Sequence, residues 1–227
     1  MQRNLKLVHD TLNKINNNCK YENLFMKFKE DTELKSKLIS YINSCVNSNK
    51  YKAIINNYFK TYKCNNINLL KVLQVKKITE QEYKALFNAL NTNKNPKLSL
   101  LEYFERIIYY LDVNWLIIPM VAILVERLII RLEALNTDNI NFCLNNKNIF
   151  YAVCGLMYII IKLFCDGQYS KEVYSLVFGL SLAKIKTIEN EILLLLDYNV
   201  FINYDELNEF IFYLKTNNNN NNNECNN

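Results

Sequence analysis

The sequence contains few of the residues on which many catalytic sites depend. Its 227 residues include one histidine, three glycines and two prolines. Zinc sites with two or more histidine ligands, complete histidine-based triads and histidine–carboxylate facial triads are all hard to build around His9 alone. Gly155, Gly167 and Gly179 are twelve residues apart, and neither GxGxxG nor GxxxxGK[ST] occurs. We therefore expect a protein that is not an enzyme and that needs no metal or cofactor.

The shortage of glycine and proline also bears on the fold class. Architectures rich in β-turns use both residues often, so a sandwich or barrel is a poor candidate. Half of the chain is apolar and 13% is aromatic, which is enough to form a buried core. These features favour an all-α fold.

Cysteine usage indicates a reducing compartment. The seven cysteines are odd in number, and no two are spaced as CxxC. The first ten residues, MQRNLKLVHD, carry charge and are not followed by the apolar segment of a signal peptide. We expect the protein in the cytoplasm, the nucleus or both.

Two apolar stretches need to be distinguished from membrane spans. Residues 113–125 and 149–161 are each 13 residues long, whereas a span needs roughly 20. Charged residues end both stretches, at Glu126–Arg127 and at Lys162. We interpret them as buried core helices and expect no membrane insertion.

Charge is distributed unevenly along the chain. Residues 1–97 hold 18 lysines and arginines against 7 acids, whereas residues 98–227 hold 9 against 15. A basic half invites a nucleic-acid or acidic-membrane interpretation. However, 17 of the 18 cations are lysines scattered among asparagines, and base recognition favours arginine. A solvated surface is the better interpretation, and specific nucleic-acid binding is not expected.

Residues 1–97 are predicted to form a basic, Asn/Lys-rich helical extension. Within it, Asp31–Ser44 carries a one-sided apolar stripe, and Thr79 with Glu82 has the pattern of a capping box at a helix start. The stripe consists of Leu34, Leu38, Tyr41 and Ile42. Helices with so few apolar residues are stable only when they pack against another part of the protein.

Longer apolar helices follow from Lys97 onward, and their short connections predict packing around a shared core. The sequence predicts helices over Ser99–Leu111, Asn114–Leu135, Lys147–Cys165, Ser170–Phe178, Ser181–Asp197 and Tyr204–Leu214. Pro119 is expected to bend or break the second of these. The C-terminal helix falls in residues 201–215, and the Asn-rich tail, residues 216–227, is expected to be disordered.

Two of these helices are apolar nearly all round. Leu193–Leu196 cover about 300° of a helix circumference, whereas one core-facing stripe covers about a third of it. The helix over 181–197 must therefore be covered by the extension, another helix or a second protein. The helix over 147–165 has the same property, and each helix carries a charge beside its apolar residues, at Lys162 and at Glu189. Either the two helices form a protein-binding face with two polar anchors, or both are central in the monomer.

The stretch from Ala152 to Val200 resembles the cyclin box of the P/U-type cyclins, the phosphate-signalling family. The matching residues, in order, are Lys162, Phe164, Asp166, Tyr169, Gly179, Ile188–Glu189 and Leu196–Asp197–Tyr198. Upstream, Tyr103–Ile107 and Val125–Leu128 are similar to motifs of the first and second helices. The resemblance covers residues 98–200 and implies a five-helix cyclin box between the extension and the C-terminal helix.

The resemblance implies a non-catalytic subunit that binds and activates a cyclin-dependent-type serine/threonine protein kinase. Lys162 and Glu189, on the third and fifth helices of the box, are then expected to hydrogen-bond backbone groups at the start of the mobile helix of the kinase. Four flanking residues are expected to contact the kinase as well: Ile159, Leu163, Asn190 and Tyr198. Arg106 and Glu126 are expected to form an internal ion pair between the first and second helices.

A second function stays open on the residues alone. A cyclin fold can act as a scaffold or transcription-type adaptor without activating a kinase, with the basic extension contacting nucleic acid. That function predicts DNA or RNA binding that weakens steeply with salt.

Overall fold

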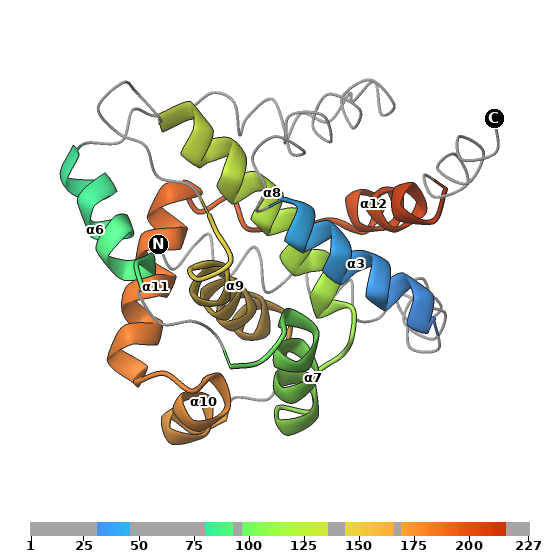
Figure 1. Cartoon of the computed structure of the whole chain (residues 1–227), viewed down its shortest axis with the longest axis horizontal. Coiled ribbons are helices and arrows are strands. Elements are labelled where there is room, and N and C mark those ends of the chain that lie inside the picture. Colours follow the sequence, from blue (N-terminus) through green and yellow to red (C-terminus); the bar gives the residue numbers. More distant parts are fainter. Residues whose placement is uncertain (1–30, 46–79, 93–96, 136–143, 166–168, 217–227) are drawn as a thin grey trace.

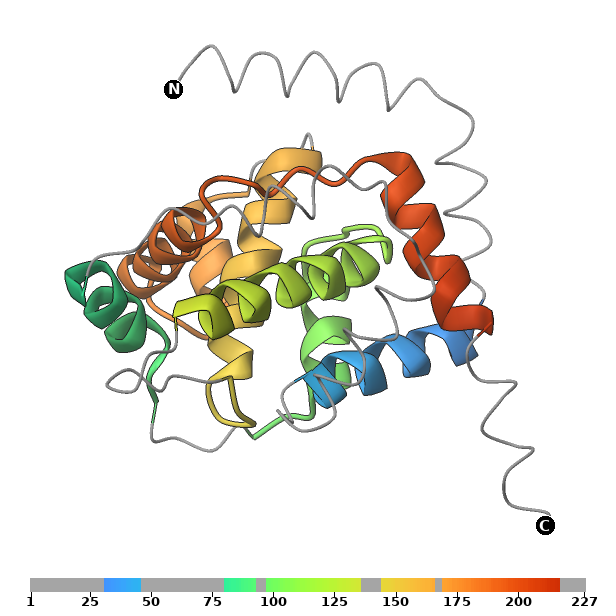
Figure 2. The ribbon, with the colours of Figure 1, turned by 90° about the horizontal axis from the view of Figure 1, so that it is seen from above.

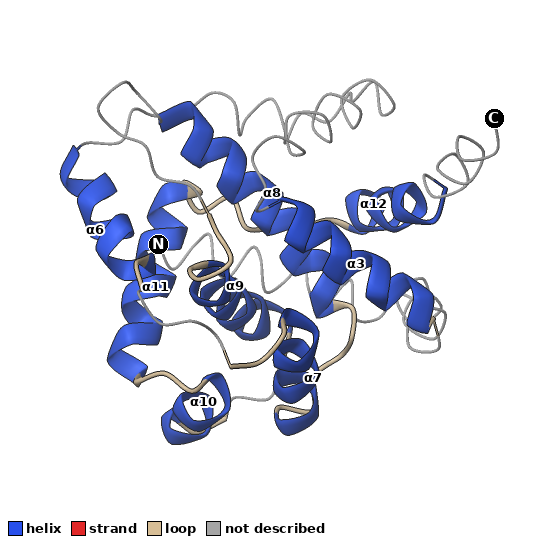
Figure 3. Cartoon of the chain, viewed as in Figure 1, coloured by secondary structure: helices blue, strands red, loops and turns tan. Residues whose placement is uncertain are grey.

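The computed structural model describes residues 31–45, 80–92, 97–135, 144–165 and 169–216. Within these ranges the chain forms helices and connecting loops without a strand, which confirms the predicted all-α class (Figure 3). The described helices are α3 (Thr32–Cys45), α6 (Glu80–Leu90), α7 (Leu100–Tyr110), α8 (Ile117–Leu135), α9 (Ile149–Phe164), α10 (Lys171–Phe178), α11 (Leu182–Leu195) and α12 (Tyr204–Thr216).

Helix α9 occupies the centre of the molecule. It lies beside α8 and α11, and the other helices surround this trio (Figure 1). Every residue from Ala152 to Ile161 is buried. An all-round apolar helix in this position loses contact with water on every side, which accounts for its uninterrupted apolar run.

Gly155 lets α9 and α11 approach closely. A methyl group added there would lie 2.5 Å from Cγ2 of Ile188 and 2.8 Å from Cδ1 of Ile192, both on α11. Such separations are far below ordinary carbon–carbon contact. The missing side chain at Gly155 therefore sets how near the two helices lie.

The outer side of α11 is partly covered by α6, a helix of the predicted extension (Figure 1). Leu86, Ala89 and Leu90 of α6 are buried, and Nζ of Lys184 on α11 donates to the carbonyl oxygen of Asn88 at 3.2 Å. Cover by the extension was one of the options predicted for this helix. The cover is incomplete, because 45% of Leu194 is exposed.

Helix α3 packs on α8 and α12, on the side of the molecule away from α6 (Figure 2). The predicted stripe is confirmed, because all four of its residues are buried on α3: Leu34, Leu38, Tyr41 and Ile42. The ring of Tyr41 meets that of Phe210 on α12 edge-on, with the centroids 5.4 Å apart. Nζ of Lys35 lies 3.9 Å from the ring centroid of Trp115. This end of the molecule therefore joins segments from both ends of the chain.

The predicted break at Pro119 is wrong. Helix α8 begins at Ile117 rather than at Asn114, because Oδ1 of Asn114 accepts a hydrogen bond from the amide of Leu116 at 2.8 Å and caps the turn before the helix. Pro119 then falls in the first helical turn, where an amide N–H has no helical acceptor to lose. The helix continues without interruption to Leu135.

Several predictions lie outside the described residues. They concern residues 1–30 with His9, residues 46–79 with Thr79, Asp166 with Gly167, and residues 217–227 of the tail. Within the described part, no helix combines the length and the apolar character that crossing a membrane requires.

Candidate functional site

Lys162 and Glu189 form an ion pair where α9 and α11 lie against each other. Lys162 is in the last turn of α9 and Glu189 is in the middle of α11, with Nζ and Oε1 2.5 Å apart. The lysine side chain is 45% exposed and the glutamate side chain 10% exposed. The packing of two core helices thus brings together, at the surface, two charges that are 27 residues apart in sequence.

Tyr158, one turn before Lys162 on α9, supports the lysine. Nζ of Lys162 lies 5.1 Å from the centroid of the Tyr158 ring, within the range of a cation–π contact. Burial raises the pKa of Tyr158, an effect that Lys162 opposes and Glu189 reinforces, so the phenol stays neutral. Rings of Tyr174 and Phe178 on α10 meet Tyr158 edge-on, with centroids 5.1 and 6.2 Å away. The lysine therefore lies against a packed aromatic cluster.

The other residues predicted to contact a partner have different exposures. Asn190 is exposed, Tyr198 is 52% exposed, and Leu163 is half-buried against the core. Ile159, in contrast, is only 2% exposed. The structure places Ile159 in the core, within the run from Ala152 to Ile161 in which every residue of α9 is buried.

Tyr198 is held by a strained turn at the end of α11. The amide of Tyr198 donates to the carbonyl oxygen of Leu193 at 2.8 Å, and the amide of Asp197 donates to that of Leu194 at 3.0 Å, which is a Schellman cap. Asp197 and Tyr198 have φ of 50° and 56°, in the left-handed region that usually takes glycine. Such backbone costs about 1–3 kcal/mol per residue and is often found at functional sites.

The sequence model of the cyclin family matches residues 32–200, which is more than half of the chain. The chain belongs to the cyclin family. Members of this family are regulatory, non-catalytic proteins. The matched range begins at residue 32 and so takes in α3 and α6, which the sequence analysis assigned to the extension. A search among curated proteins finds no match.

In this cyclin, Arg106 and Glu126 have partners other than each other. Nη2 of Arg106 donates to the carbonyl oxygen of Leu176 on α10 at 2.9 Å. Glu126 accepts a hydrogen bond from the hydroxyl of Tyr41 on α3. The predicted pair between them is not among the ion pairs of the described residues. Arg106 instead joins α7 to α10, and Glu126 joins α8 to α3.

The cyclin has a buried ion pair elsewhere, between Arg127 on α8 and Glu206 on α12, with Nη2 and Oε1 2.5 Å apart. Nη1 of Arg127 also donates to the carbonyl oxygens of Asn199 at 3.0 Å and Phe201 at 2.9 Å. Arg127 thereby ties the segment after α11 to the second helix of the box. The Val125–Leu128 motif contains Arg127, but sequence gave no sign of a partner 79 residues away.

Glu126, next to Arg127, is a buried carboxyl group on α8. Burial and the nearby Glu206 carboxylate raise its pKa to about 8, against the opposing effect of Arg127. The raised pKa favours the protonated form of Glu126, because a neutral carboxyl group costs less to bury than a carboxylate.

Among the described residues no three histidine, cysteine, aspartate or glutamate side chains are grouped to hold a metal ion. What the α9–α11 site offers is a binding surface: the ion pair of Lys162 and Glu189, with Leu163 and Asn190 beside these residues in the chain and Tyr198 exposed after the end of α11. We refer to Lys162, Glu189, Leu163, Asn190 and Tyr198 together as the α9–α11 face.

Proposed function

We propose that this cyclin is the regulatory subunit of a cyclin-dependent-type serine/threonine protein kinase, which it binds and activates through the α9–α11 face. The observation that carries the proposal is the ion pair of Lys162 and Glu189 at the surface where α9 and α11 meet. The partner and the activation are inferred from family membership together with this pair.

The ion pair suits recognition of a helix end. The ammonium group of a lysine has three donors and a carboxylate has several acceptor positions, so both groups can bind a partner while they stay paired. The first amides of a helix have no acceptor within the helix, and the loop that leads into it contributes few groups to the helical hydrogen bonds. Buried unpaired at an interface, such groups would cost about 1–3 kcal/mol each. Lys162 and Glu189 would satisfy them and fix the register of docking.

The apolar members of the face would supply affinity. Tyr198 is exposed and Leu163 is half-buried, so each still has surface to lose to a partner. Large aromatic side chains near the centre of an interface often dominate its binding energy. The strained turn at Asp197 and Tyr198 holds that tyrosine in place before binding, which lowers the entropic cost of ordering it.

Activation follows if the cyclin binds the active arrangement of the kinase better than the inactive one. A kinase needs its strand lysine paired with a glutamate on the mobile helix, and a partner that grips this helix favours the paired state. Each 1.4 kcal/mol or so of differential binding shifts the equilibrium tenfold. A few kcal/mol across the α9–α11 face would convert a mostly inactive kinase into a mostly active one.

We also infer that the chain is a P/U-type cyclin and acts in the cytoplasm, the nucleus or both. The order of the short motifs from Lys162 to Tyr198 supports the subfamily, and the odd number of cysteines without CxxC supports a reducing compartment.

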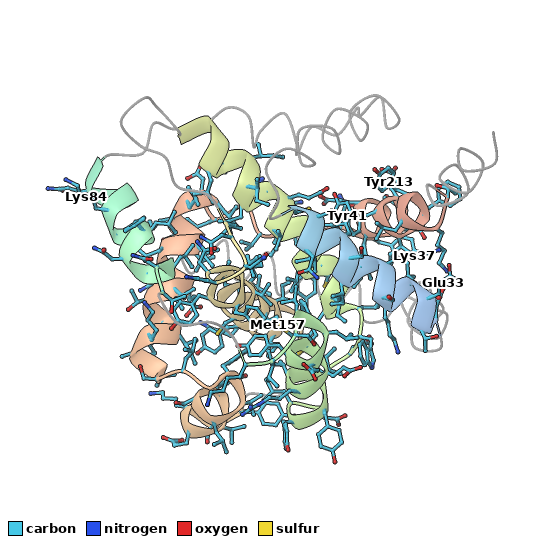
Figure 4. All side chains as sticks on the ribbon, viewed as in Figure 1. Glu33, Lys37, Tyr41, Lys84, Met157 and Tyr213 are labelled. Atoms are coloured by element: carbon cyan, nitrogen blue, oxygen red, sulfur yellow. The ribbon has the colours of Figure 1, made fainter. Side chains whose placement is uncertain are left out.

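The test is co-purification with candidate kinases followed by a phosphate-transfer assay on the complex. Lys162→Ala combined with Glu189→Ala should weaken binding by about tenfold or more, and kinase activity should fall with it. Glu33→Ala combined with Lys37→Ala is the matched control, because it removes an ion pair between exposed or half-exposed residues on α3 (Figure 4). The control should bind and activate as the unchanged protein does.

Two results would contradict the proposal. If the Lys162/Glu189 variant binds and activates normally while remaining folded by circular dichroism, the face is not the interface. If no kinase is retained and the protein instead binds DNA or RNA with a steep salt dependence, the adaptor function is the better one.

A further inference from the structure

The long, flexible side chain of Lys162 adopts one orientation only if its neighbours hold it. Glu189 is one of these neighbours, with Oε1 2.5 Å from the ammonium nitrogen. A carboxylate attracts a cation from a wide range of directions, and an ion pair that is open to water holds a lysine only weakly. Because 45% of the lysine side chain is exposed, a second contact decides which orientation it adopts.

Tyr158 provides that second contact. It precedes Lys162 by four residues on α9, so the two side chains lie on the same face of the helix. A helical side chain points back toward the start of its helix, which directs Lys162 over the turn that contains Tyr158. Nζ of the lysine lies over the ring, 5.1 Å from its centroid. The ammonium group is thus held between a carboxylate of α11 and an aromatic ring of its own helix.

The ring of Tyr158 is itself fixed, because it is only 7% exposed and packs against α10. Tyr174 and Phe178 of α10 both meet it edge-on. These two rings stack on each other with an interplanar angle of 12°, and the hydroxyl of Tyr103 on α7 donates to the carbonyl oxygen of Phe178 at 3.1 Å. Helices α7 and α10 therefore set the position of the Tyr158 ring before any partner binds.

Helix α9 contains a second tyrosine–lysine contact for comparison. Tyr151 lies two turns before Tyr158, and Nζ of Lys184 on α11 is 5.2 Å from the centroid of its ring. Lys184 also donates to the carbonyl oxygen of Asn88 on α6 at 3.2 Å. The two contacts have nearly the same distance between nitrogen and ring, but only the Tyr158 contact involves a residue of the α9–α11 face.

We propose that Tyr158 is a positioning residue for kinase binding, whose ring holds the ammonium group of Lys162 in the orientation that meets the partner. This inference rests on the proposed function. Tyr158 does not itself touch the kinase, because its side chain is almost completely buried. It acts through Lys162, by lowering the entropic cost of ordering a rotamer-rich side chain at the interface.

The first experiment measures binding of the full chain to a kinase that it retains. Tyr158→Leu removes the ring and should weaken binding about three- to tenfold, the range expected for one cation–π contact. Tyr158→Phe keeps the ring and should bind as the unchanged protein does. Tyr151→Leu is the matched control, because it removes the ring of the other tyrosine–lysine contact, and it should leave kinase binding unchanged.

A double-mutant cycle distinguishes positioning from a purely structural role. Lys162→Met removes the charge and keeps a long, unbranched side chain. If Tyr158 acts through Lys162, Tyr158→Leu should weaken binding no further in the Lys162→Met background. A general loss of packing against α10 would instead weaken binding equally in both backgrounds. Tyr158→Met repeats the cycle if Tyr158→Leu lowers the melting temperature, because methionine adapts to irregular gaps in a core.

Nuclear magnetic resonance of the full chain with isotope-labelled lysine tests the contact without a kinase. Protons over the face of an aromatic ring resonate upfield of their ordinary position, so the Hε signals of Lys162 should be displaced upfield. The signals are assigned by their disappearance in Lys162→Met. The displacement should persist in Tyr158→Phe and vanish in Tyr158→Leu.

The proposal is overturned if Tyr158→Leu binds the kinase normally, if it weakens binding equally in both backgrounds, or if Tyr158→Phe loses as much affinity. It is also overturned if the upfield displacement survives the loss of the ring. These results leave the proposed function intact as long as Lys162→Met weakens kinase binding. If Lys162→Met binds normally, the proposed function fails and the positioning role for kinase binding fails with it, while the spectrum still decides whether Tyr158 holds Lys162.

Discussion

Gly155→Ala is the substitution by which the packing of α9 on α11 can be tested most directly. The new methyl group would lie 2.5 Å from Cγ2 of Ile188 and 2.8 Å from Cδ1 of Ile192. Carbon atoms in good contact are about 3.5–4.0 Å apart, so the helices must separate by roughly 1 Å or the isoleucines must leave their rotamers. Cδ1 of Ile192 can swing away, but Cγ2 of Ile188 is attached directly to Cβ and moves only with the backbone or χ1.

Two opposing effects set the magnitude. Replacing glycine by alanine inside a helix stabilises it by roughly 0.5–1 kcal/mol, through backbone entropy and propensity. Forcing an extra methyl group into a packed core costs about 1–3 kcal/mol. The steric effect is the larger, so the free energy of unfolding should fall by about 1–2 kcal/mol. Urea unfolding followed by far-ultraviolet circular dichroism measures this change.

A double-mutant cycle separates the clash from any other cause. Ile188→Ala removes Cγ2 and leaves a cavity, so alone it should cost about 2–5 kcal/mol. In the double variant the alanine at Gly155 partly fills that cavity, so the combined loss should be smaller than the sum of the two single losses. Binding to the kinase should weaken in Gly155→Ala as well, because Ile188 adjoins Glu189. A variant at Gly155 that is as stable as the unchanged protein would refute the close approach of α9 and α11.

Two further substitutions probe the buried and strained groups. Burial raises the pKa of Glu126 from its ordinary value of 4.5 to about 8, so the folded chain binds this proton more tightly than the unfolded chain does. The free energy of unfolding should therefore fall as pH rises from about 4.5 to about 8. In Glu126→Gln this fall should be smaller, and urea titrations across the range measure it. An unchanged pH dependence would contradict the pKa shift. Asp197→Gly should raise the free energy of unfolding by roughly 1 kcal/mol, because glycine adopts a φ of 50° without strain. A higher urea midpoint would show this gain. No gain, or a loss, would mean that the aspartate side chain compensates for its backbone.

Much of the fold could be predicted from local sequence signals. Ser99 and Ser181 cap α7 and α11, with side chains that accept from the amides of Glu102 and Lys184. The Asp31–Ser44 stripe corresponds to α3, and the helix expected after Thr79 corresponds to α6. These predictions succeeded because caps and apolar stripes act within one or two turns of a helix. The prediction at Pro119 failed because it depended on the exact start of the helix. The helix begins three residues later than predicted, which moves Pro119 into the first turn, where a proline is tolerated.

For the candidate site too, the sequence predicted local features but not contacts between distant segments. The amino-acid sequence by itself singled out Lys162 and Glu189 as charges on two largely apolar helices. It could not show that their side chains meet, that Ile159 is buried, or that Arg106 bonds to α10 instead of to Glu126. Those outcomes depend on contacts between segments tens of residues apart, and periodicity along one helix carries no information on which neighbour covers each side. The packing of α9 against α8 and α11, together with the cover of α11 by α6, decided which sides of these two helices stayed in water.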